Sequence, residues 1–229
     1  DPNNNEEEDN DTTPVYGHLT TANTVSDVVN HEAFNEFGRF ILPAERSYNV
    51  NMTLQNVASM LPYHNYITGE RAVETINTMV DYVHDGNTLF YDIYSDADKQ
   101  ADSRKNNTGL FFFRGEPGKP FAIVCPGGGF SYVGAIHEGF PLAIALSKMG
   151  YNAFSIQYRT GGAQVACEDL AGAIDFIMRH AEELQVSTDD YSLWGGSAGA
   201  RMAAYLGSYG TQGFISAVHP RPATVVMGY

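Results

Sequence analysis

The chain has 229 residues, with 13 Lys and Arg against 27 Asp and Glu, which gives a formal net charge of −14. Hydrophobic residues make up 43% and charged residues 17%, a globular composition that can bury a sizeable core and excludes wholesale disorder. The acidic balance argues against a nucleic-acid-binding surface, which needs a basic stripe. No apolar run approaches the roughly 20 residues that cross a bilayer.

The acidic residues gather at the N-terminus, where residues 1–11 hold six of them and no base. Such a stretch has nothing to bury, so we expect residues 1–15 to form a disordered acidic spacer. The sequence does not begin with Met. A mature bacterial protein, secreted or lipid-anchored after loss of its signal, would look like this and would be extracellular or at the cell surface. A chain cut at an arbitrary point is the alternative.

Residues 16–86 predict a helical or irregular extension packed on the core. Apolar residues recur there at helical spacing, at Val73, Ile76, Val80 and Val83, with Met79 beside them. Gly86 should end this helix. Tyr63 and His64 follow a proline-marked turn, and either line the mouth of a pocket or lie on the surface.

From residue 87 the spacing of apolar residues changes and predicts strands that alternate with helices. Strands are predicted over 88–94, 109–113, 121–125, 151–158, 191–194 and 224–227, and helices over about 139–149, 166–184 and 198–206. This alternation indicates crossover connections and a mostly parallel sheet covered on both faces. Cys125 and Cys167 lie in apolar surroundings and are expected to be buried free thiols.

Two glycine-rich turns follow strands of this sheet. Residues 195–199 read Gly-Gly-Ser-Ala-Gly and fit G-x-S-x-G between a strand and a helix. That context holds Ser197 in strained backbone with its hydroxyl pushed outward, and it requires small neighbours. Residues 126–130 read Pro-Gly-Gly-Gly-Phe, a loop whose exposed N–H groups could stabilise an oxyanion. A phosphate loop or an incidental turn are the alternatives, but G-x-G-x-x-G and a Walker lysine are both absent.

The order and spacing of these turns resemble the α/β-hydrolase fold, in its serine esterase and lipase branch. Adding His137-Glu138-Gly139 and Gln157-Tyr158-Arg159, residues 87–229 resemble bacterial carbohydrate-associated acetyl-esterase-like hydrolases. The resemblance implies a three-layer α/β/α sandwich. It also implies Ser197 as nucleophile and the N–H groups of Gly128, Gly129 and Ala198 as oxyanion hole. The chain departs from the common pattern with Pro126 in place of His and Gly196 in place of Asp.

Charged residues near these turns are expected to have structural roles. Glu138 should anchor the glycine loop, since the acid and base of this fold follow the serine in the chain. Arg159 should pair with Glu168 or Asp169. Arg201 should tie its helix to its surroundings.

The expected acid and base of a serine hydrolase are missing. No Asp or Glu follows Ser197. His219 lies just before the last strand, on the side of that strand from which it cannot serve as the base for Ser197. The domain at 87–229 therefore looks truncated after its sixth strand, as a fragment or a cleaved subunit whose second chain supplies both groups. A complete but inactive module is the alternative.

The leading hypothesis is a serine carboxylesterase that acts on short-chain, acetyl-type esters, carbohydrate esters included, through an acyl-enzyme on Ser197. An exopeptidase of the same fold and a non-catalytic binding protein with an incomplete triad are the alternatives. We expect no cofactor, no metal ion, no nucleic acid and no transmembrane segment.

Overall fold

The computed structural model describes residues 17–43, 45–61 and 67–229. The expected acidic spacer, Tyr63 and His64 lie outside these ranges. Within them, no helix is both long and apolar enough to span a bilayer.

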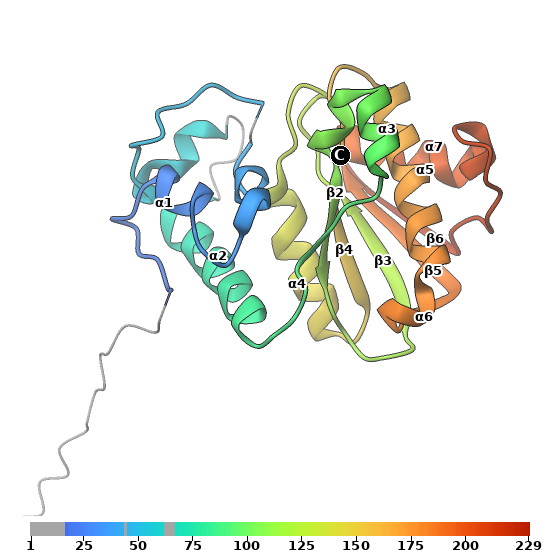
Figure 1. The fold of residues 1–229 in the computed structure, drawn as a ribbon, viewed down its shortest axis with the longest axis horizontal. Helices are drawn as coiled ribbons and strands as arrows, with labels where there is room; N and C mark the ends of the chain where they lie inside the picture. Colours follow the sequence, from blue (N-terminus) through green and yellow to red (C-terminus); the bar gives the residue numbers. More distant parts are fainter. Residues whose placement is uncertain (1–16, 44, 62–66) are drawn as a thin grey trace, which may run out of the picture.

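A six-stranded sheet forms the centre of the molecule (Figure 1). Its strands are β1 (Phe90–Tyr91), β2 (Gly109–Phe113), β3 (Pro120–Cys125), β4 (Asn152–Gln157), β5 (Ser187–Gly196) and β6 (Thr224–Gly228). They lie in the order β1-β2-β4-β3-β5-β6. Strand β2 pairs antiparallel with both β1 and β4, and the β4-β3, β3-β5 and β5-β6 pairs are parallel. The predicted mostly parallel α/β sheet is confirmed. The first strand is shorter than predicted, and β5 begins four residues earlier than residue 191.

Helices cover both faces of the sheet, as predicted for crossover connections. In Figure 1, α4 (Phe140–Lys148) lies on one side, and α5 (Ala163–Arg179), α6 (Ala181–Leu184) and α7 (Ala198–Tyr209) lie on the other. A single π-helical turn over Ala135–Gly139 leads into α4. The short helix α3 (Asp96–Ala101) and a 3₁₀ turn (Ser103–Asn107) connect β1 to β2.

The N-terminal part packs outside α4. It contains α1 (Val25–Val29), two 3₁₀ turns (Asn35–Phe40 and Leu54–Met60) and α2 (Gly69–His84). Helix α2 is capped by Thr68 and buries Ile76, Met79 and Val80, as the helical spacing predicted, while Val73 and Val83 are only half-buried. The ring of Phe37 stacks on Phe90 of β1 at 5.1 Å between centroids, which joins this part to the sheet.

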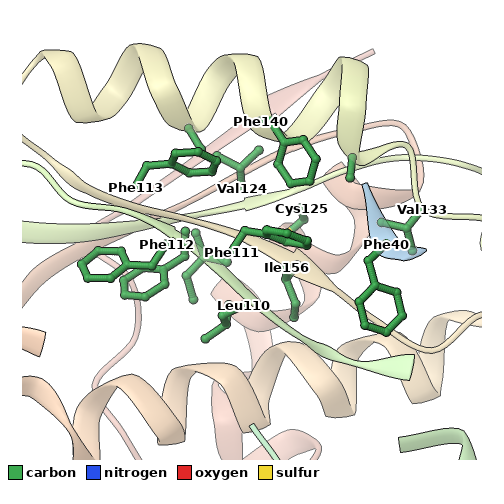
Figure 2. Close-up of a cluster of buried hydrophobic side chains, with 14 of the residues drawn as sticks. Phe40, Leu110, Phe111, Phe112, Phe113, Val124, Cys125, Val133, Phe140 and Ile156 are labelled. Atoms are coloured by element: carbon green, nitrogen blue, oxygen red, sulfur yellow. The ribbon is translucent and has the colours of Figure 1, made fainter. Parts of the chain in front are cut away.

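Strand β2 shows how the core is divided between the two faces. Alternation directs Phe111 and Phe113 toward Phe140 of α4, at 4.6 and 6.1 Å between ring centroids (Figure 2). Phe112 points to the opposite face and stacks on Phe154 of β4 at 4.2 Å. Every residue of β2 is buried, because helices cover both sides. Cys125 is a buried free thiol, as predicted.

Candidate active site

Ser197 occupies the single residue between β5 and α7. Its backbone has φ 52° and ψ −121°, a conformation that costs about 1–3 kcal/mol for a residue with a side chain. A serine before a helix normally accepts a hydrogen bond from an amide of the first turn. The Ser197 side chain makes no such capping bond, so its hydroxyl is not used to stabilise the helix.

The residues around Ser197 are small because strand and helix touch there. A Cβ atom on Gly199 would overlap the carbonyl oxygen of Cys125, and one on Gly195 would overlap the backbone of Gly199. Larger residues at either position would push α7 away from the sheet. The strand-turn-helix placement of Ser197 predicted from the sequence is therefore confirmed.

The glycine loop lies directly against this turn. Strands β3 and β5 are neighbours in the sheet, with Cys125 paired to Gly195, so the segments that follow them meet at one edge. A Cβ atom on Gly127 would lie 3.2 Å from Cβ of Ser197 and 2.9 Å from the carbonyl oxygen of Gly196. The structure thus brings together the two turns that the sequence singled out.

The loop directs its carbonyl groups into its own turn. The carbonyl of Gly128 accepts hydrogen bonds from the N–H groups of Ser131 (3.0 Å) and Tyr132 (3.3 Å), and that of Gly127 accepts from Gly134 (2.9 Å). Gly128 has φ 145° and Gly129 has φ 63°, conformations that favour glycine. Among the described residues, we find no acceptor for the N–H groups of Gly128 and Gly129.

Glu138 joins the loop to the end of β6. One carboxylate oxygen accepts a hydrogen bond from the N–H of Gly127, and the other accepts one from the hydroxyl of Tyr229. The expectation that Glu138 anchors the loop agrees with this contact. The Tyr229 ring lies about 3.3 Å from a Cβ position on Gly196, and Ser197 N–H donates to the Gly228 carbonyl at 3.1 Å. No sequence pattern indicated these contributions from β6.

The carboxyl end of β4 carries a buried charge cluster. The Arg159 guanidinium donates to Asp169 at 2.8 and 3.0 Å and also contacts Glu168 (3.4 Å) and Asp102 (3.1 Å). Burial alone would lower the pKa of Arg159. The hydrogen bonds that Arg159 donates to Asp169, and the negative charge of that carboxylate, instead raise this pKa above its ordinary value. The predicted pairing of Arg159 is confirmed, and Asp102 is an additional partner.

His219 and Arg201 have partners away from the Ser197 hydroxyl. The His219 imidazole bonds to Asp175 on α5 at 2.8 Å, and the backbone N–H of His219 donates to Thr211 Oγ1 at 3.0 Å. Arg201 lies over the Phe130 ring at 5.4 Å and donates to the hydroxyl of Tyr205 at 3.3 Å. The described part of the chain contains no group of three or more His, Cys, Asp or Glu side chains arranged to hold a metal ion.

Comparison with known families supports the interpretation of this geometry. The model of the BD-FAE family matches residues 114–220, which include the glycine loop, β4 and the Ser197 turn. None of the curated proteins compared with the chain is significantly similar to it.

Solved structures with similar folds include enzymes from bacteria and a metagenome. The α/β hydrolase MGS-M1, from a Medee basin deep-sea metagenome, is 25% identical, with 53% of this chain and 51% of MGS-M1 covered and a TM-score of 0.47. A sugar hydrolase, YeeB of Lactococcus lactis, is 26% identical, with 52% and 48% covered and a TM-score of 0.45. A thermophilic esterase of Thermogutta terrifontis, solved with propionate bound, is 20% identical, with 52% and 48% covered and a TM-score of 0.46.

The matched part of this chain spans about half the length of each of those enzymes. The sheet order, the strained Ser197 turn and the family match at 114–220 agree with one another. The protein has the fold of an α/β hydrolase.

Proposed function

We propose that this protein is a serine carboxylic-ester hydrolase that acts on short-chain, acetyl-type esters, with carbohydrate esters among its substrates. The observation that carries the proposal is the Ser197 hydroxyl, held in strained backbone at the head of α7 without a capping bond. Structural serines at helix starts usually cap. A strained serine that does not cap, beside a glycine loop, fits a nucleophile.

The proposed reaction uses an acyl-enzyme. Ser197 Oγ attacks the ester carbonyl and loses its proton to a base, which later protonates the leaving alcohol. Water then attacks the acyl-enzyme, releases the carboxylic acid and restores the hydroxyl. The N–H groups of Gly128, Gly129 and Ala198 would stabilise the oxyanion of both tetrahedral intermediates. The Ala198 N–H suits this role because it is at the N-terminus of α7, where no intrahelical acceptor exists.

We further propose that the catalytic acid and base come from polypeptide beyond residues 1–229, on a C-terminal segment or a second chain. No Asp or Glu follows Ser197 in these residues, and the imidazole of His219 is bonded to Asp175. Met227 on β6 is 61% exposed, so this edge of the sheet has room for another element. We propose an extracellular or cell-surface location, consistent with the acidic residues 1–11.

Labelling with a fluorophosphonate tests the proposal. An activated serine in the full-length protein should react within minutes, and peptide mapping should place the label on Ser197. A panel of acetyl, butyryl and feruloyl esters and of aminoacyl amides would then define the acyl group and separate an esterase from an exopeptidase. Failure of Ser197 to react would favour a binding protein that retains the pocket without activating the serine.

A further inference from the structure

The N-terminal part of the chain reaches the glycine loop through one side chain. Glu45 bonds with one carboxylate oxygen to the side-chain amide of Gln157, at 3.0 Å, and with the other to the N–H of Val133, at 3.3 Å. Gln157 is the last residue of β4 and is 2% exposed, and Val133 follows the glycine loop and is 1% exposed. Glu45 therefore links the loop to the sheet, from a position 88 residues earlier in the chain than Val133.

The neighbouring residue makes a second contact with the same loop. The Arg46 guanidinium lies 5.0 Å from the centroid of the Tyr132 ring, a cation–π arrangement. Tyr132 packs so closely on Gly128 that a Cβ atom on Gly128 would overlap the Tyr132 carbonyl. A shift of Tyr132 or Val133 would therefore move Gly128, whose N–H is one of the proposed oxyanion donors.

We infer that Glu45 is a positioning residue, which holds the glycine loop so that its N–H groups face the carbonyl under attack at Ser197. This inference rests on the proposed function. It assigns a role to the N-terminal extension: the hydrolase domain needs it to complete its oxyanion hole. Glu45 contacts the loop and not the substrate, so its loss should lower turnover more than substrate affinity.

The chemistry of the link gives a sharp test. Glu45 accepts from two donors, the Gln157 amide and the Val133 N–H, which only a carboxylate can do with both oxygens. In Glu45→Gln one side of the new amide is a donor, so the link re-forms only if the Gln157 amide turns over to present its oxygen, and it should be weakened. In Glu45→Gln combined with Gln157→Glu the polarity is reversed: the new glutamine donates to the new glutamate and accepts from Val133. The double variant should recover what the single variant loses.

The experiment compares Glu45→Ala, Glu45→Gln and the double variant in the full-length protein, with Glu32→Gln, an exposed glutamate of the same extension, as control. Two quantities are measured: the fluorophosphonate labelling rate of Ser197, and hydrogen exchange of residues 127–134. Glu45→Ala should label roughly 10- to 100-fold more slowly, the scale of a small displacement of catalytic groups, and Glu45→Gln should show a smaller loss. Their 127–134 amides should exchange faster than in the control.

The outcomes separate this inference from the proposed function. If Glu45→Ala labels at the rate of Glu32→Gln, Glu45 does not position the oxyanion donors, even where exchange shows that it holds the loop. If the double variant folds and labels no faster than Glu45→Gln, the assignment of donors and acceptors is wrong. If the unsubstituted protein itself fails to label at Ser197, the proposed function fails. Exchange of residues 127–134 in Glu45→Ala then still decides whether Glu45 holds the loop.

Discussion

The ends of β4 and β5, which flank β3 at the same edge of the sheet, differ in how their residues are stabilised. At the end of β4, Arg159 is 5% exposed and is surrounded by three carboxylates, so every charge has a partner. At the end of β5, Ser197 has unfavourable backbone angles and a hydroxyl that does not cap its helix. The β4 end is built for stability, and the β5 end holds strain. If Ser197 is the nucleophile, as we propose, a dense charge cluster is a poor guide to the reactive position here, and a strained small residue is a better one.

Replacing Ser197 should produce the largest effect and separates the two strand ends. Ser197→Ala should reduce ester turnover by several orders of magnitude, as removal of a nucleophile does, while the unfolding free energy changes little. Ser197→Gly should be equally inactive but more stable by about 1 kcal/mol, because glycine adopts this backbone without strain. Turnover on p-nitrophenyl acetate and urea unfolding measure both quantities. Near-normal turnover by Ser197→Ala would refute the assignment of the nucleophile.

Breaking the β4 cluster should act on stability instead. Arg159→Met leaves Asp169, which is fully buried, without its cation and should cost about 3–5 kcal/mol of unfolding free energy. The matched control is Arg179→Met, which removes an exposed ion pair with Asp175 and should cost at most about 1 kcal/mol. Urea unfolding at neutral pH measures the difference. Equal losses in the two variants would show that the cluster does not stabilise the β4 end.

A substitution in the glycine loop should lower turnover, but by less than the loss of Ser197 does. A Cβ atom on Gly128 would overlap the Tyr132 carbonyl, so Gly128→Ala should displace the loop and lower kcat by about 100-fold, the scale for loss of one oxyanion donor. Gly86→Ala is the matched control: Gly86 also has positive φ, and nothing lies within 4 Å of its Cβ position. Only the first variant should lose turnover. Equal kcat values in both variants would remove Gly128 from the proposed hole.

The sequence was sufficient to predict those features of the fold and the site that depend on a few consecutive residues. The Ser197 turn, the glycine loop and the helical face of α2 follow from spacing and from residue size over a few positions. Contacts between segments far apart in the chain could not be predicted from the sequence. Glu45 meets Gln157 112 positions later, and no composition or period at residue 45 marks it. Tyr229 likewise becomes part of the site only because β6 pairs with β5 and brings it beside Gly196.

The boundaries of two strands were also predicted inaccurately, because the sequence gives only local information. Residues 187–190 look polar and exposed, yet they extend β5 beside the start of β3. Conversely, residues 88–94 alternate like a strand, but only Phe90 and Tyr91 pair with β2. Pairing depends on which partner backbone is within reach, and alternation alone does not specify that.

The smallest expected effect is that of low pH, which should reduce the stability contributed by the charge cluster at the end of β4. Hydrogen bonds from Arg104, together with the charges of Arg104 and Arg159, lower the pKa of Asp102 below its ordinary value of 3.8. A carboxyl group with a lowered pKa contributes stability that is fully present above about pH 4 and is lost as pH falls toward the folded-state pKa. Asp102→Asn should therefore be less stable than the unsubstituted protein at pH 6, and the difference should shrink steadily as the pH falls below about 4. Urea midpoints across this range measure the gap, and a gap of constant size would show that the Asp102 charge does not stabilise the cluster.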